Sequence, residues 1–269
     1  MPELIIAGED SYYFQKAENK THSQCTRHYH NSFEIYYLKA GRCNYFIDNR
    51  SYDLQIGDIV LIPEGIIHKT NYDKREPHTR YLINCSSPFV PREVLPMLPS
   101  MIYLYRNSEI TEMVEKLLVR IGEEYERGDS FREEALRCLT FELFFLLARN
   151  MNDCSEVGAG SLFIEETVKY IQKNYMTDIN LSMMAKLHSV SPEHLSRTFK
   201  KETGFGFSEY LTLVRLQKAE YMLRNEPRKS VCEIAYACGF NDSNYFSDKF
   251  KRTYGQSPTK FKSSLSRKS

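Results

Sequence analysis

The chain carries LSRTFKK at residues 195–201 and repeats the pattern as FSDKFKR at residues 246–252. In the first copy Leu195 and Phe199 stand four positions apart, and basic residues follow the second of them. Residues four apart lie on one face of a helix, so each copy predicts a helix with a buried face and a basic face. The repeat therefore indicates two copies of one structural unit.

Each copy follows a short helix and a turn, the order of a helix-turn-helix motif. In the first unit Asn180 is expected to cap a helix from residue 181 to about residue 188. Ser191 is expected to cap the second helix, with Pro192 at its first position and Gly204 at its end. These residues predict a complete first unit.

The second unit has equivalent signals. Ser230 and Glu233 form a predicted capping box, and Gly239 supplies the turn. Asp242 or Ser243 is expected to open the next helix, and Gly255 to close it. Small residues are needed where the two helices of each unit cross, and the chain has Ala185 and Ala235 there.

An apolar stripe from Phe207 to Arg224 predicts one longer helix between the two units. A rigid spacer of this kind lets both second helices reach successive major grooves, about 34 Å apart, on one face of DNA. The pattern therefore favours a double contact with DNA over an ordinary helical bundle.

The C-terminal motifs resemble those of the AraC/XylS family of bacterial transcription regulators. The resemblance covers about residues 162–262 and rests on IAYACGF at residues 234–240, YFS at 245–247, FKR at 250–252, Gly255 and the Ser-Pro pair at 257–258. It implies a DNA-binding domain of two units whose second helices read promoter DNA. It also implies regulation through recruitment or repositioning of RNA polymerase.

Helical spacing selects the residues that face DNA when the apolar residues turn inward. Arg197 is the first choice for a base contact, because a guanidinium can pair with guanine for about 1–3 kcal/mol of discrimination. Asn244 could read adenine, and Asp248 either accepts from cytosine or weakens the second unit's grip. The predicted DNA-contacting set is Glu193, His194, Ser196, Arg197, Lys200, Lys201, Ser243, Asn244, Ser247, Asp248, Lys251 and Arg252.

Charge is distributed unevenly along the chain. The whole sequence has 36 basic and 35 acidic residues, but residues 161–269 hold 18 basic against 11 acidic and residues 1–160 hold 18 against 24. A basic C-terminal half suits phosphate neutralisation, which predicts DNA affinity that falls with salt.

The N-terminal half alternates like short antiparallel strands from residue 33 to residue 68, which predicts a small barrel or jelly roll. The order His28, His30, Glu34 and Gly41, followed later by Gly57, Pro63, Gly65 and His68, resembles the two cupin motifs. Residues two and four apart on a strand share a face, so His28, His30 and Glu34 are expected to point into the barrel, where the turn at residues 63–65 is expected to bring His68.

The sequence leaves open whether the barrel binds a metal ion or an organic effector. Three imidazoles and a carboxylate suit a divalent transition metal at His28, His30, Glu34 and His68. The resemblance instead implies a sensor domain that binds an organic effector and requires no metal. Polar candidates for effector binding are Arg27, His28, His30, Glu34, Tyr36 and His68, with Tyr12 and Tyr37 also nearby, and a sugar or related metabolite fits them.

Two helices are predicted after the barrel, at residues 108–127 and 130–149, the second opened by a Ser130/Glu133 capping box. The stretch 141–147 is apolar almost all round, and in the resembling family such helices pair two subunits, so a homodimer through residues 108–149 is expected. Residues 151–161 are small and polar and predict a linker.

The fold class is thus predicted as two-domain α+β, with an N-terminal cupin-like β-barrel or jelly roll with two helices and a C-terminal all-α double helix-turn-helix domain. The predicted boundaries are a sensing barrel at 1–105, a helical dimerisation segment at 106–150, a linker at 151–161 and a DNA-binding domain at 162–269. With no run of about 18 apolar residues, no membrane span is expected. The N-terminus lacks a signal-peptide pattern, and seven unpaired cysteines fit reduced thiols, so a cytoplasmic protein is expected.

The predicted function is a sequence-specific transcription regulator that binds double-stranded promoter DNA, a small-molecule effector and RNA polymerase, and that is not an enzyme. One alternative is a metal-dependent cupin enzyme fused to a DNA-binding domain. A second is an architectural DNA-binding protein whose barrel only dimerises. A pocket filled by side chains would support the second alternative.

Overall fold

The computed structural model describes residues 12–20, 32–72, 76–98, 103–106, 109–151 and 161–265. The chain divides into two compact units, one that holds most residues up to 158 and one that holds residues from 159 onward. The described strands belong to the first unit, apart from residues 50–51, and every described helix after residue 159 belongs to the second.

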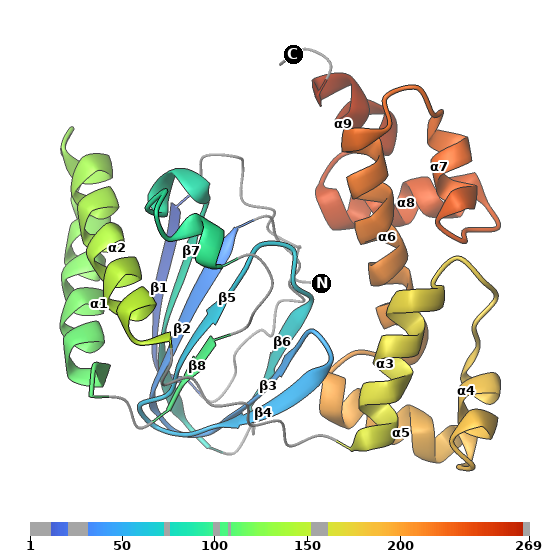
Figure 1. Ribbon diagram of the computed structural model, residues 1–269, viewed down its shortest axis with the longest axis horizontal. Helices are drawn as coiled ribbons and strands as arrows, with labels where there is room; N and C mark the ends of the chain where they lie inside the picture. Colours follow the sequence, from blue (N-terminus) through green and yellow to red (C-terminus); the bar gives the residue numbers. More distant parts are fainter. Residues whose placement is uncertain are drawn as a thin grey trace. The chain divides into compact units, whose positions relative to one another are not determined.

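Two β-sheets form the first unit (Figure 1). The larger has five antiparallel strands in the order β1-β7-β2-β5-β8, and the smaller has three in the order β4-β3-β6. The strands are β1 (Tyr12–Lys20), β2 (Phe33–Ala40), β3 (Cys43–Ile47), β4 (Arg50–Leu54), β5 (Ile59–Ile62), β6 (His68–Asn71), β7 (His78–Cys85) and β8 (Tyr103–Tyr105).

Alternation along the strands separates two apolar cores. On β2, Ile35 and Tyr37 join a core that includes the two helices after the barrel, whereas Tyr36 and Leu38 join a core made by both sheets. Because successive strand residues point to opposite faces, the second core is the interior between the sheets. The predicted jelly-roll-like arrangement is confirmed.

The helices α1 (Thr111–Glu126) and α2 (Arg132–Arg149) cover the outer face of the larger sheet (Figure 1). Between β7 and β8 lie two short 3-10 helices, η1 (Ser87–Phe89) and η2 (Leu95–Met97). The predicted capping box of α2 is wrong, because the helix starts later and Phe131 is its N-cap residue. Asp129 Oδ1 instead accepts from the Phe131 amide at 2.9 Å, and Glu133 accepts from Arg137.

The second unit is entirely helical. Its helices are α3 (Leu162–Asn174), α4 (Leu181–Leu187), α5 (Pro192–Thr203), α6 (Phe207–Asn225), α7 (Val231–Ala237), α8 (Ser243–Tyr254) and α9 (Pro258–Leu265). Helices α4 and α5 form the first helix-turn-helix, α7 and α8 the second, and α6 is the predicted long helix between them (Figure 1).

The predicted caps of this unit are present. Asn180 accepts from the Met183 amide, and Ser191 accepts from the His194 amide. Ser230 and Glu233 form the predicted capping box. Of the two residues proposed to open α8, Asp242 is the one whose side chain accepts from the helix.

The predicted glycines at the helix ends and turn, and the predicted small residues at the helix crossings, are also present. Gly204 and Gly255 end α5 and α8 in the left-handed conformation that glycine adopts without a steric cost. Gly239, with φ of +85°, forms the turn after α7. Ala185 and Ala235 are buried where the paired helices cross. Within the described helices, none is long and apolar enough to span a membrane.

Candidate DNA interface and effector site

Helix α5 presents a polar, mostly basic face to solvent. Leu195 and Phe199 are fully buried and hold the helix against its unit. The opposite face exposes the predicted contact residues Glu193, Ser196, Arg197, Lys200 and Lys201. His194 is exposed too, but its ring also stacks on Phe163 of α3, with ring centroids 5.9 Å apart.

Helix α8 has the same buried anchor but a different outer face. Phe246 and Phe250 are fully buried. Asn244, Asp248, Lys251 and Arg252 are exposed, while Ser243 and Ser247 are half-buried.

An ion pair lies on the outer face of α8. Arg252 Nε is 3.0 Å from Asp248 Oδ2, one helical turn away. Both side chains are more than half exposed, so the pair contributes little to stability. It does engage the Arg252 guanidinium, which was predicted to contact phosphate. Among the described residues, the α5 face has no equivalent ion pair.

The apolar interior between the sheets also contains buried polar side chains. Glu34 is 1% exposed and accepts a hydrogen bond from the Tyr45 hydroxyl. When the amide of Asn84 is oriented with its nitrogen towards Glu34, it donates to Oε2 at 2.9 Å. Such a buried carboxylate is retained only where partners satisfy it.

His68 completes this group. Its Nε2 lies 3.4 Å from Glu34 Oε2, and its Nδ1 is 2.7 Å from the Ile66 carbonyl oxygen. Burial alone would lower the pKa of His68, but the Glu34 carboxylate outweighs burial and raises it. The structure thus brings together two of the four residues predicted to hold a metal.

Only one of the remaining predicted effector residues lies in the described part of the chain. Arg27, His28 and His30 lie outside the described residues. Tyr36 points into the interior, where its hydroxyl is 2.9 Å from that of Tyr72. No group of three or more potential metal ligands occurs among the described residues.

Tyr12 and Tyr37 are not interior residues, which corrects their place among the nearby candidates. Both belong to the core that the sheet forms with the helices. Tyr12 hydrogen-bonds Thr140 of α2, and Tyr37 donates to Glu115 of α1. Strand alternation explains the result, because Tyr37 directly follows the inward-facing Tyr36.

Three interior residues were missed at the level of sequence. His78 and Arg80 share the inward face of β7 with Leu82, and Tyr72 stacks on His78 at a centroid distance of 3.7 Å. The spacing of two between His78 and Arg80 predicts that both lie on one face of a strand, but no known motif includes them.

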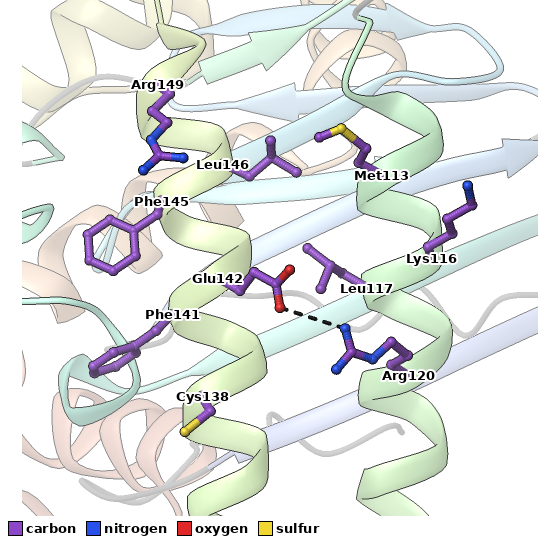
Figure 2. A pocket seen from close by; sticks show the side chains of 10 residues that line it. All are labelled: Met113, Lys116, Leu117, Arg120, Cys138, Phe141, Glu142, Phe145, Leu146 and Arg149. Carbon is purple, nitrogen blue, oxygen red and sulfur yellow. Dashed lines mark ion pairs between the residues drawn. The ribbon is translucent and has the colours of Figure 1, made fainter.

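A groove runs between α1 and α2 on their side away from the sheet (Figure 2). Phe145, which is 38% exposed, and Phe141 line it from α2, and Met113 lines it from α1. Arg120 and Glu142 face each other across it at 3.7 Å.

Comparisons with known proteins agree with this geometry. Residues 12–139 match the AraC-like ligand binding domain, and residues 184–264 match a helix-turn-helix domain. The fold and sites thus define a transcription regulator with an N-terminal ligand-binding domain and a C-terminal DNA-binding domain. The chain belongs to the AraC family of such regulators.

Individual relatives span most of the chain. The HTH-type transcriptional activator RhaS of Escherichia coli (strain SMS-3-5 / SECEC) is 26% identical over 86% of this chain and 85% of its own length. The Msm operon regulatory protein of Streptococcus mutans is 26% identical over 87% and 85%. A solved C-terminal domain of AraT, a response regulator from Geobacillus stearothermophilus, is 33% identical over 40% of this chain and 88% of that domain, with a TM-score of 0.38. These curated relatives are transcriptional regulators rather than enzymes.

Proposed function

We propose that α5 and α8 are the reading helices of this regulator and that α5 makes the main base contacts. In each helix, buried side chains hold one face against the unit, and polar side chains are exposed on the other face. This arrangement carries the proposal. Arg197 lies in the middle of the α5 face and forms no ion pair with any described residue, so its guanidinium is available for a guanine edge. Lys200 and Lys201 would neutralise phosphates beside it.

The test is selection of a DNA site by the full chain, followed by binding of that site and its single-base variants at several salt concentrations. Arg197→Ala should lose preference at one or two base pairs. Lys218→Ala removes an exposed cation from α6, outside both reading helices, and should leave base preference unchanged. Unchanged preference in Arg197→Ala would overturn the assignment.

We further propose that a small-molecule effector, a sugar or related metabolite, binds between the two sheets. The buried polar groups of Glu34, Tyr36 and His68 support this, because a few polar groups in an otherwise apolar interior are typical of small-molecule sites. A ligand at 100 times its dissociation constant should stabilise the protein by about 2.7 kcal/mol, which a thermal-shift screen detects.

A homodimer through α1 and α2 is part of the proposal. The apolar groove around Phe141 and Phe145 supports it, since burying those rings against a second copy removes them from water. Phe145→Glu should shift the protein towards monomer in sedimentation velocity. Val119→Glu places the same charge on an exposed residue of α1 outside the groove and should not.

The proposed output is regulation of transcription through RNA polymerase in the cytoplasm, where bacterial promoter DNA lies. A reporter fused to the selected site, measured with and without the regulator, gives the sign of the effect. Loss of activation by a variant that still binds DNA would locate the polymerase contact.

The proposal requires no bound metal, and the metal-dependent enzyme remains the alternative. Glu34 and His68 are the observation that favours it, because a carboxylate and an imidazole at this distance can share a divalent cation. Metal analysis of the purified full chain tests it. Stoichiometric metal in the wild type that is lost in His68→Gln would favour the alternative.

A further inference from the structure

A buried guanidinium that forms no ion pair with any described residue lies inside the sensor domain. Arg80 sits on the inward face of β7, opposite Leu38 of β2 and next to the interior residues of both sheets. Its Nη2 donates to Gln15 Oε1 at 2.7 Å. Its Nε and Nη1 are buried and have no hydrogen-bond partner among the described residues.

The adjacent inward residue shows the same deficit. His78 is 1% exposed, and neither of its ring nitrogens has a hydrogen-bond partner in the part of the chain that the structure describes. Buried polar groups in native proteins are nearly always satisfied, so two neighbouring residues with unsatisfied nitrogens indicate a missing partner. The stacked ring of Tyr72 holds the imidazole in place.

The interior carboxylate does not supply that partner. Glu34 is engaged by Tyr45 and His68, and although it is near enough to act on Arg80 electrostatically, the two residues form no ion pair. Among the described residues, no carboxylate lies within ion-pair distance of the Arg80 guanidinium. A buried charge of this kind is costly unless something pairs with it.

We propose that Arg80 anchors a carboxylate of the effector, so that the ligand is an acid rather than a neutral sugar. The inference rests on the proposed effector function and narrows its ligand class. One positive charge on Arg80 is balanced by the single charge of a carboxylate, whereas a phosphate monoester brings up to two. The Glu34 carboxylate, elsewhere in the same interior, further disfavours the higher charge.

The neighbouring groups suit the remainder of such a ligand. The Tyr36 and Tyr72 hydroxyls, 2.9 Å apart, can each donate or accept. Burial, followed by the charge of Arg80, lowers the pKa of His78, so its ring is neutral and offers one donor and one acceptor. Together these groups fit a hydroxylated acid, with hydroxyls beside the tyrosines and the carboxylate at Arg80.

The experiment uses the full chain and pairs of compounds that differ only in an acidic group. Galactose and galacturonate, glucose and glucuronate, benzyl alcohol and benzoate, and glucose 6-phosphate are compared by thermal shift, and binders are then titrated by calorimetry. At least one acid should bind about tenfold or more tightly than its neutral partner, because a charge-assisted contact replaces a neutral one.

Variants locate the contact. Arg80→Gln should remove the preference for the acid, and Arg80→Lys should keep a weakened preference because it keeps the charge. Lys16→Gln removes an exposed cation from β1 beside Gln15 and should change nothing. Unliganded circular dichroism and melting temperature establish that each variant is folded, and if Arg80→Gln does not fold, the preference of the wild type and of Arg80→Lys decides.

The outcomes distinguish failure of the predicted acid preference from failure of the effector function. Neutral compounds that bind as tightly as their acids overturn the inference but leave the effector function standing. Preferred binding of glucose 6-phosphate over all three carboxylates overturns the choice of a carboxylate. An acid preference that survives in folded Arg80→Gln overturns the role of Arg80. If no compound binds, the effector proposal fails for these classes, and the inference fails with it.

Discussion

Two glycines in the second helix-turn-helix allow a quantitative test of how its turn is built. Gly239 and Gly255 both have positive φ, +85° and +71°. An added Cβ at Gly255 meets nothing within 4 Å. At Gly239 it would lie 2.7 Å from the Tyr175 carbonyl oxygen and 3.0 Å from Arg215 Nε.

The magnitudes follow from these distances. Gly255→Ala places an alanine in the left-handed conformation, which destabilises the fold by about 1–2 kcal/mol. The same substitution reduces the conformational freedom of the unfolded chain, which offsets about 0.4–1 kcal/mol of that destabilisation. Gly239→Ala adds a clash with the Tyr175 carbonyl oxygen, a backbone atom that cannot rotate away as a side chain can. It also breaks the 2.8 Å hydrogen bond from Arg215 Nε to Tyr175, a charged-donor contact of about 1.5–3 kcal/mol.

The expected difference between the two variants is therefore at least about 1.5 kcal/mol, more than tenfold in the opening equilibrium. Hydrogen–deuterium exchange of the α7 and α8 amides in the full chain measures it, because it reports local opening without requiring two-state unfolding of both domains. Equal loss of protection in Gly239→Ala and Gly255→Ala would refute the reasoning. So would a Gly239→Ala variant that binds the selected DNA site as tightly as the wild type.

Three further predictions concern other parts of the molecule. Arg197→Ala should cost about 1–3 kcal/mol at the base pair it reads and less at substituted sites, measured by fluorescence anisotropy. Phe145→Glu should weaken self-association, seen as a dimer constant that rises in sedimentation equilibrium while far-ultraviolet circular dichroism is unchanged. The hydrogen bond from Lys39 lowers the pKa of Glu115 below 4.5, so its contribution to stability is present above that pH and is lost as the pH falls through the folded value. Below about pH 4.5 the wild type should therefore lose stability more steeply than Glu115→Gln in urea titrations, and parallel curves would contradict this.

The structure of the DNA-binding unit was predictable because its signals are local. Asn180, Ser191, Ser230 and Glu233 cap helices through contacts within three residues, so their roles do not depend on distant parts of the chain. The capping box at Ser130 failed for a related reason. Nearby Asp129 competes for the same helix end, and sequence alone does not rank the two.

The interior of the barrel depends on long-range pairing. Glu34 and His68 were predicted to converge, because strand alternation gives each residue's face. Their neighbours were not, since Arg80 joins the interior only through the register of β7 with β2. Tyr37 was named among the nearby polar candidates although it lies on the face covered by helices, because alternation alone does not say which face that is.

The amino-acid sequence by itself determined the two-domain fold class, the repeated helix-turn-helix, its caps and its outward basic face. These features follow from spacing and from contacts between near neighbours in the chain. Only the tertiary structure decided which polar side chains share the barrel interior, that Asp248 pairs with Arg252, and that the Arg80 guanidinium is buried with no ion-pair partner among the described residues. Such facts depend on which distant segments pack together, and burial and pairing are properties of that packing rather than of any residue alone.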